Sequence, residues 1–475
     1  MYKLFLFTLW KDVLFTHFHD IIPGSSIGPV YEATEKKYAE VIAKADAMAE
    51  HAAKTVVEER EDAITVFNPL SWERDTYITL PDGYTSLCDK DGTSLETQKV
   101  DGKTIARVSL PSMGYRSFTL GTEKIKTEKK DNPYLTLENQ FLSVLFNTQG
   151  EIISIYDKEK GMEYLQGPSN RFRMYKDMPT FCDAWDIEAF YEKLEVPLEE
   201  TAEVKVAYRG ALMDAITITR KLHHSTLKQT VTLKKDSRVI EFETEIDWQE
   251  SHKLLKVDFA TNIHTEDLLS ETQFGYVKRP THKNRPYDAD RFEVCQHKWS
   301  ALTEGKRGFA ILNDSKYGIG IKESTMSLTL LESSQEPARN ADKGIQIFTY
   351  SVLPFAEAFT ESDVVREAYQ LNCPPMSMQG VAGEKSFFTI SEENVIVETV
   401  KIAEDSSGDL IVRLYECMNS FTNCELIFGF PVQEVYKTDM LENTQEKLAV
   451  EENGITLAMK AFEVVTLREK NKLNI

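Results

Sequence analysis

The stretch "FTHFHDIIPGSSIGPVYEAT" at residues 15–34 places a His–Asp pair between two segments with helical character. An apolar run precedes the pair, and a run rich in Ala, Glu and Lys follows it. On a helical wheel the apolar residues of 4–22 fall on one side, which predicts a buried helix. Pro23-Gly24 is expected to end that helix. The sequence therefore predicts two helices joined by a turn that carries a histidine and an aspartate.

His19 lies about opposite the apolar side of the first predicted helix, so it is expected to face something other than that helix's core. Zinc is usually held by three or four His, Asp, Glu or Cys ligands. Neighbouring helical residues point in different directions, so only one of His19 and Asp20 would bind a given metal ion. The residues alone leave two interpretations open: one ligand of a metal site, or an ordinary histidine at a helix end beside an aspartate.

Composition narrows the classes of partner. The chain has 475 residues, which suggests about three domains, and a formal net charge of −21. An acidic surface repels nucleic acid and anionic membranes, so neither is expected as a partner. No run of eighteen apolar residues occurs, so no spanning helix is expected. The six cysteines are scattered without a C-x-x-C pair, and no cleavage pattern follows the apolar N-terminal run, which together favour a cytoplasmic protein.

Beyond about residue 62 the apolar pattern changes to a period of two, with turn residues between the runs. Long, closely spaced strands without intervening helices favour a large antiparallel sandwich. The predicted fold is mainly β with an N-terminal helical-bundle remnant, a small β domain, a large antiparallel β-supersandwich and a C-terminal β-sandwich. The predicted domains are 1–58 for the helical segment with the His–Asp motif, 60–122 for the small β domain, 132–375 for the large sandwich and 380–475 for the last sandwich.

Most common catalytic motifs are absent. The sequence has no G-x-G-x-x-G, no G-x-x-x-x-G-K-[ST] and no G-x-S-x-G. Among 76 acidic residues, a carboxylate pair for glycoside hydrolysis cannot be chosen by spacing.

Two clusters combine aromatic rings with charged and amide side chains. One is "DMPTFCDAWDIEAFYE" at 177–192, which contains Trp185, and the other spans 274–299 and contains Arg279 and His282. Such residues suit the recognition of sugar hydroxyls. The alternative, that they are structural residues of long sandwich loops, stays open on this evidence.

At this point a family resemblance becomes visible. "FHDIIPGSSIGPVYEAT" is similar to the F-H-D-I-x-P-G-[ST] motif of glycoside hydrolase family 38, the zinc-dependent retaining α-mannosidases. "VFNPLSWER" at 66–74 resembles the family's first strand after its helical bundle, and "LENQFLSVLFNTQGEIISIYDKEKG" resembles the opening of its large β domain. "VKIAEDSSGDLIVRLYE" resembles its terminal domain, so the likeness runs in order along nearly the whole chain.

The resemblance implies roles for individual residues. His19 corresponds to the last of four zinc ligands, and Asp20 to a residue that contacts the substrate mannose. Trp185, Arg279 and His282 are expected to line the substrate cleft. In the family an N-terminal α/β barrel supplies the other zinc ligands, the nucleophile and the general acid/base, and none of these has a counterpart here. No catalytic residue is therefore assigned within this chain.

Three functional hypotheses follow. The first is the C-terminal part of an α-mannosidase, inactive alone, that pairs with the missing barrel or with an oligomer partner; it predicts an exposed apolar surface on the helical segment. The second is a stand-alone carbohydrate-binding protein that binds sugar without metal. The third is a non-catalytic subunit that pairs with a separate barrel chain. In all three the expected ligand is a carbohydrate.

Overall fold

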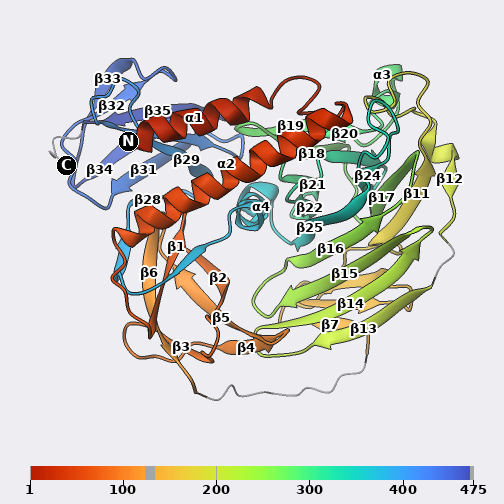
Figure 1. Cartoon of the computed structure of the whole chain (residues 1–475), viewed down its shortest axis with the longest axis horizontal. Helices are drawn as coiled ribbons and strands as arrows, with labels where there is room; N and C mark the ends of the chain where they lie inside the picture. Colours follow the sequence, from red (N-terminus) through yellow and green to blue (C-terminus); the bar gives the residue numbers. More distant parts are fainter. Residues whose placement is uncertain (1, 124–133, 199–200, 471–475) are drawn as a thin grey trace. The chain divides into compact units, whose positions relative to one another are not determined.

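The computed structural model describes residues 2–123, 134–198 and 201–470. The chain divides into two compact units. The first unit comprises residues 1–50, 128–271 and 278–372, and the second comprises 51–127, 272–277 and 373–475. Most elements are strands, as the labels in Figure 1 show. The predicted mainly β fold is confirmed. The four predicted domain ranges are not tested by this division and stay a prediction.

The first unit begins with two helices, α1 (Tyr2–Phe15) and α2 (Gly28–Lys54), drawn in red in Figure 1. Two polar contacts join them. The hydroxyls of Thr16 and Tyr38 are hydrogen-bonded at 2.5 Å, and Lys37 Nζ donates to Asp12 Oδ1 at 3.3 Å. The helices therefore pack side by side through a face of α1 that carries Asp12 and the residues one turn away from it.

The prediction of a buried helix over 4–22 is wrong in two respects. The helix ends at Phe15, and residues 16–24 form turns. Of the described side chains of α1, only Leu9 is buried. Leu9, Asp12 and Thr16 follow a helical spacing, so the contact face lies on that side of the helix and the predicted apolar stripe points away from it. Six large apolar side chains of α1 are exposed: Phe5, Leu6, Phe7, Trp10, Leu14 and Phe15.

The core of the first unit is a sandwich of two sheets. The nine-stranded sheet has the order β13-β14-β15-β16-β25-β22-β21-β18-β19, and the six-stranded sheet has the order β12-β11-β17-β24-β23-β20. The strands of the larger sheet are β13 (Ala202–Tyr208), β14 (Met213–Leu222), β15 (Ser225–Lys234), β16 (Ile240–Trp248), β18 (Asp267–Thr272), β19 (Gly275–Pro280), β21 (Trp299–Glu304), β22 (Arg307–Asn313) and β25 (Gly344–Phe355). Those of the smaller sheet are β11 (Arg171–Lys176), β12 (Glu195–Val196), β17 (Lys253–Ala260), β20 (Val294–Cys295), β23 (Gly318–Lys322) and β24 (Thr325–Glu332).

Aromatic side chains join the two sheets. Phe242 of β16 stacks on Tyr350 of β25 with ring centroids 4.9 Å apart, and its other contact is an edge-on arrangement with Phe259 of β17 at 5.8 Å. All three rings are buried. A four-stranded sheet, β10-β9-β8-β7, belongs to the same unit and adds Val144 and Ile155 to this core. Its strands are β7 (Thr136–Glu138), β8 (Leu142–Phe146), β9 (Ile152–Asp157) and β10 (Met162–Glu163).

Three short helices interrupt the strands of the first unit. They are η1 (Tyr191–Lys193), α3 (Pro286–Ala289) and α4 (Val364–Asn372), with the single turn η2 (Phe359–Glu361) just before α4. Helix α4 lies directly after β25 and the turn η2. It buries Val364, Val365 and Ala368 against the sandwich.

The second unit consists of four smaller sheets. Their orders are β26-β1-β6-β27 with β3 paired to β6, β2-β5-β4, β28-β31-β34 and β29-β30-β35-β32-β33. The strands before the gap at 124–133 are β1 (Ala63–Asn68), β2 (Arg74–Thr79), β3 (Ser86–Cys88), β4 (Thr97–Val100), β5 (Lys103–Leu110) and β6 (Gly114–Gly121). The later ones are β26 (Met376–Gln379), β27 (Glu384–Ser386), β28 (Phe388–Ile390), β29 (Val395–Ile402), β30 (Leu410–Glu416), β31 (Thr422–Phe428), β32 (Val435–Thr438), β33 (Thr444–Leu448), β34 (Gly454–Met459) and β35 (Val464–Glu469).

Alternating burial explains why these segments form strands. In β31 every second side chain is buried, including Cys424, Leu426 and Phe428, so one face joins a core and the other meets solvent. Within the described residues, no helix is both long and apolar enough to cross a membrane.

Candidate functional site

The His–Asp motif lies in the turn between α1 and α2. The side chain of His19 is 74% exposed and that of Asp20 is 44% exposed, and His19 Nε2 lies 3.9 Å from Asp20 Oδ2. The ring of Phe18 lies 4.3 Å from the imidazole ring. Both groups therefore face outward, in position to contact a ligand or a neighbouring protein surface.

The residues after the motif hold the turn in place. Two serines donate hydrogen bonds to the backbone carbonyl of Asp20. The backbone N–H of Ser25 does so at 3.2 Å and the hydroxyl of Ser26 at 2.5 Å. Gly24 has a φ of +75°, a conformation that glycine adopts without strain, and its carbonyl accepts the hydroxyl of Tyr31 from the first turns of α2. The Pro-Gly-Ser-Ser sequence thus fixes the backbone that presents His19.

The described residues do not form a complete metal site. No group of three or more His, Cys, Asp or Glu side chains in them is arranged to hold a metal ion. A zinc ion needs three or four such ligands. His19 and Asp20 offer two groups at most, so the described residues alone do not complete a zinc site.

Acidic residues from two strand ends lie beside the start of α2. Burial raises the pKa of Tyr31, and the carboxylates of Asp342 and Glu332 raise it further. Glu332 is the last residue of β24, and Asp342 lies in the connection from β24 to β25. The ends of the sandwich strands therefore approach the segment that follows the His–Asp turn.

Asp177 and Glu332 form a carboxyl pair at this end of the sandwich. Within the described residues, neither oxygen of Asp177 nor Oε1 of Glu332 accepts a hydrogen bond from an N–H or a hydroxyl group. Burial raises the pKa of both groups, and the charge of Asp177 raises that of Glu332 further. Burial and the neighbouring charge of Asp177 therefore hold the pKa of Glu332 well above its usual range.

Asp183 connects the 177–192 segment to the β24–β25 connection. Its Oδ2 accepts the backbone N–H of Gln335 at 2.5 Å and that of Glu336 at 3.0 Å. Its other oxygen lies 3.3 Å from Nδ1 of His252, in the turn before β17. Trp185, two residues later, is 56% exposed on the same segment. Asp183 therefore fixes the loop that presents Trp185.

Arg279 lies on β19 and is half-buried. Its Nη2 donates to Cys295 O at 3.1 Å, and burial lowers the pKa of its guanidinium. His282 lies beyond the end of the same strand, where Nδ1 accepts the backbone N–H of Asn284 at 3.4 Å and lies 3.7 Å from Asp288 Oδ2. Both side chains thus contact residues of the segment 284–295, which contains α3.

The structure pairs some candidate residues and leaves others separate. His19 and Asp20 are adjacent, and Arg279 and His282 lie at one end of one strand. Among the described residues, no hydrogen bond, ion pair or ring contact joins either pair to the other or to Trp185. Their common role in one cleft stays a prediction.

Sequence reasoning found only part of the carboxyl cluster formed by Asp177, Asp183, Glu332 and Asp342. Asp177 and Asp183 stood in a stretch already singled out, but Glu332 and Asp342 lie in a segment without any motif. The signal was indirect, because Glu332 ends a strand whose neighbour β17 also pairs with β11, the strand just before Asp177.

Comparison with known proteins identifies the family. The chain matches three family descriptions in order: the alpha mannosidase middle domain over residues 4–56, the glycosyl hydrolases family 38 C-terminal domain over 137–340, and the family 38 C-terminal beta sandwich domain over 394–467. The chain belongs to glycoside hydrolase family 38. It carries the middle and C-terminal domains of that family, as the resemblance in the sequence implied.

Full-length relatives of this family 38 chain are named as mannosidases. It is 31% identical to alpha-mannosidase 2C1 of Homo sapiens over 481 residues, which cover 97% of this chain and 45% of the relative. It is 29% identical to alpha-mannosidase G of Dictyostelium discoideum over 523 residues, which cover 97% of this chain and 47% of the relative. The chain therefore spans about half the length of the curated relatives it matches.

Solved structures support the fold of this family 38 chain. An alpha-mannosidase from Enterococcus faecalis V583 superimposes with a TM-score of 0.81 at 16% identity, over 97% of this chain and 63% of that one. A family 38 glycosyl hydrolase from the same species gives a TM-score of 0.80 at 17% identity, over 97% and 65% of the two chains. At this level of identity the likeness establishes the fold.

Proposed function

We propose that this chain is the C-terminal part of a zinc-dependent retaining α-mannosidase that hydrolyses terminal α-mannosides. Its family membership and the names of its relatives support the reaction class. The nucleophile and the general acid/base are proposed to come from an N-terminal α/β barrel, because about half of each relative lies outside the match. The chain alone is then inactive, and a covalent mannosyl-enzyme intermediate forms only once the barrel is present.

Each candidate residue has a proposed role in that assembly. His19 contributes one zinc ligand, and Asp20 contacts the mannose. Trp185, Arg279 and His282 contact more distant parts of the substrate. The exposure of His19 and Asp20 supports their part of the proposal, since both groups are free to meet a surface supplied by another domain.

The observation that carries the proposal is the apolar face of α1. Six large apolar side chains of one short helix are exposed, with Phe15 75% and Trp10 61% accessible. Phe18 and Ile22, on either side of the His–Asp pair, are also more than half exposed. An apolar patch of this kind marks an interaction surface. Because the patch continues into the turn that carries His19, a barrel bound there would lie next to the proposed zinc ligand.

A reconstitution experiment tests this function. The purified chain is assayed for bound zinc and for hydrolysis of an aryl α-mannoside, alone and with a separately purified barrel domain of a family relative. We expect neither zinc nor turnover from the chain alone, and both after addition of the barrel. Phe15→Glu should abolish the reconstitution, whereas Phe421→Glu, at an exposed phenylalanine of the second unit, should not. Stoichiometric zinc with turnover by the chain alone would overturn the proposal.

The location and partners are proposed on chemical grounds. None of the six cysteines, all of which lie in the described part of the chain, forms a disulfide, and this supports a reducing compartment such as the cytoplasm. The net charge of −21 supports a carbohydrate rather than a nucleic acid or an anionic membrane as the ligand.

A further inference from the structure

A cavity of about 260 Å³ lies on the outer face of the six-stranded sheet. Alternation along the strands creates it. Phe172 and Met174 of β11 point into the sandwich core, and Arg173 between them points outward. Asp258 of β17 and Ser327 of β24 occupy the same outer face as register partners. The cavity is smaller than pockets of about 300–1,000 Å³ that hold drug-sized ligands, so it suits one ring.

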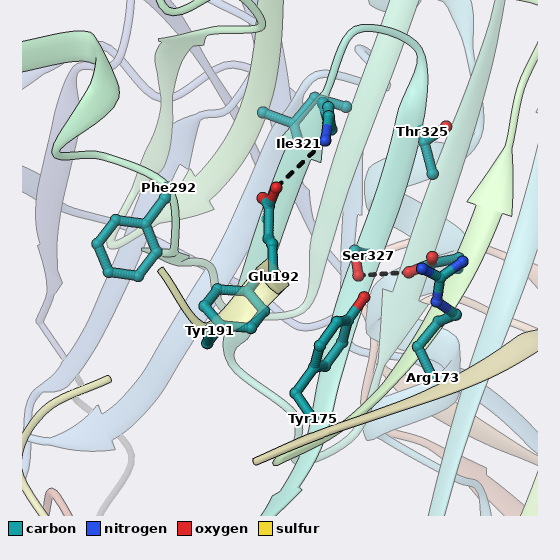
Figure 2. A pocket seen from close by; sticks show the side chains of 11 residues that line it. Arg173, Tyr175, Tyr191, Glu192, Phe292, Ile321, Thr325 and Ser327 are labelled. Carbon is teal, nitrogen blue, oxygen red and sulfur yellow. Dashed lines mark hydrogen bonds and ion pairs between the residues drawn. The ribbon is translucent and has the colours of Figure 1, made fainter. Parts of the chain in front are cut away.

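One side of the cavity is aromatic. The rings of Tyr175 and Tyr191 meet edge to face with centroids 5.0 Å apart, and Phe292 lies 6.0 Å from Tyr191. Both tyrosines are buried, whereas Phe292 is half-buried and exposes part of its ring. Figure 2 shows the hydroxyl of Tyr175 pointing toward Ser327 and Arg173, across from Phe292. A ligand in this cavity would therefore contact an apolar surface on one side and polar groups on the other.

Asp258 is the central polar group. Ser327 Oγ donates a hydrogen bond to its Oδ1, and its second oxygen has no hydrogen-bond partner among the described residues. Burial raises the pKa of Asp258, while the guanidinium of Arg173 acts in the opposite direction. Enclosing a carboxylate with so few donors costs free energy, and such sites are often retained for binding. Because Asp258 lines the cavity, its second oxygen is available as an acceptor for a ligand.

The charges around the cavity balance. Two acids and two bases line it: Arg173, Glu192, Asp258 and Lys322. Lys322 Nζ donates to Glu192 Oε2 at 3.2 Å, and Arg173 Nη2 donates to Glu195 Oε2 at 2.6 Å. A lining without net charge disfavours a phosphate or another strongly charged ligand. It favours a neutral molecule that carries several hydroxyl groups.

The wall that bears Phe292 is held in place from behind. The buried Lys256 donates to Glu293 Oε2 at 2.6 Å and to Thr329 Oγ1 at 2.7 Å, which ties the residue after Phe292 to the sheet. Gly320 allows this close packing, since a Cβ there would lie 3.1 Å from Phe292 O. A preformed cavity loses little conformational freedom when it binds a ligand.

We propose that this cavity binds a single neutral sugar ring, at a site separate from the His19–Asp20 turn. The apolar face of the ring packs against Phe292, and its hydroxyls donate to Asp258 and accept from Arg173. The choice of mannose as the first sugar rests on the proposed function. The binding itself involves no catalytic step and no metal.

Saturation-transfer NMR on the full chain, without zinc or barrel, tests the site. The probes are methyl α-D-mannopyranoside, methyl β-D-glucopyranoside and N-acetylglucosamine. We expect saturation transfer to at least one sugar, and strongest transfer to protons on one face of the ring. Asp258→Asn, which keeps the shape but removes the charged acceptor, should weaken binding by about tenfold. Asp267→Asn, at an exposed carboxylate of β18, should leave it unchanged.

A second variant separates binding from folding. Phe292→Ala removes the apolar wall and leaves the charged groups in place, so it should also weaken sugar binding by several-fold. Thermal melting shows whether each variant is folded. The site would be overturned if none of the three sugars showed saturation transfer. It would also be overturned if folded Asp258→Asn and folded Phe292→Ala both bound the sugar as tightly as the unmodified chain. If the sugar binds but the barrel restores no hydrolysis, the proposed function fails and the sugar site stands. If the barrel restores hydrolysis but no sugar binds to the chain alone, the sugar site fails and the proposed function stands.

Discussion

Asp183 holds Gln335 by accepting its backbone N–H at 2.5 Å, although 152 residues separate the two in sequence. This bond joins the segment that carries Trp185 to the connection between β24 and β25. It also places Asp183 within reach of the Asp177–Glu332 pair, whose pKa values its charge helps to raise. This end of the sandwich thus holds three acidic side chains in different surroundings: Asp183 accepts two backbone N–H groups, whereas burial raises the pKa of both Asp177 and Glu332.

The pH dependence of stability should reveal the raised pKa of Glu332. In the fold the pKa of Glu332 is raised, whereas in the unfolded chain it is close to 4.3. The folded state therefore binds the extra proton, and stability falls as the pH rises from about 5 towards 9. Glu332→Gln mimics the protonated form and should remove about 1–3 kcal/mol of this fall between pH 6 and pH 8.5. Urea unfolding at both pH values measures it, with exposed Glu203→Gln as the control. An unchanged slope in Glu332→Gln would show that another group binds the proton.

Loss of the Asp183 carboxylate should loosen two loops together. Asp183→Asn weakens the charged acceptor for two backbone N–H groups and removes the partner of His252, so we expect a loss of about 1–3 kcal/mol in the free energy of unfolding. Hydrogen exchange at residues 335 and 336 should accelerate. Asp186→Asn, in the same segment with only a local bond to Ile187 N, is the matched control. Equal exchange in both variants would refute the coupling of the loops.

Substitutions on α1 should separate its two faces. Trp10→Lys on the exposed face should leave the free energy of unfolding within about 0.5 kcal/mol and should lower binding of the dye ANS. Leu9→Ala, on the face that contacts α2, should cost about 2–4 kcal/mol, because it leaves a cavity. Chemical unfolding and dye fluorescence measure the two effects. A large loss of stability in Trp10→Lys would show that the apolar face is covered within the chain.

The buried ion pair behind the cavity should be sensitive to the loss of one partner. Lys256→Met leaves Glu293 beside Thr329 without its cation, and we expect a loss of about 3–5 kcal/mol. The double variant Lys256→Met with Glu293→Gln should recover much of this loss, since no uncompensated charge remains. Thermal unfolding of the two variants side by side checks it. If the double variant is as unstable as the single one, packing rather than charge determines the cost.

The sequence predicted elements well where side-chain periodicity has one cause. The Ala, Glu and Lys run of α2 has high helix propensity, and the alternation of strands such as β5 and β31 follows from one buried face. The prediction for α1 failed because an apolar stripe indicates that a surface is to be covered, but not whether the same chain covers it. Leu9, which is buried, and Thr16, which is hydrogen-bonded to Tyr38 of α2, were too few to stand out against that stripe.

The residues of the candidate site could likewise be found from the sequence only where they are neighbours in the chain. His19 and Asp20 are neighbours in sequence, so a motif was sufficient to find them. Asp177 and Glu332 are brought together only because β11 and β24 both pair with β17, and strand register over such distances cannot be read from one sequence. The sugar cavity was hidden for the same reason, since Asp258 and Ser327 meet only as cross-strand partners.

The segment 177–192 belongs to two sites at once. Its middle carries Asp183 and Trp185, and its last residues place Tyr191 and Glu192 in the wall of the cavity. A ligand that holds Tyr191 in place and the hydrogen bonds of Asp183 restrain the same short length of backbone. By reciprocity, each should therefore strengthen the other. The indole of Trp185 then serves as a built-in optical reporter, whose emission registers events at the cavity wall without a label.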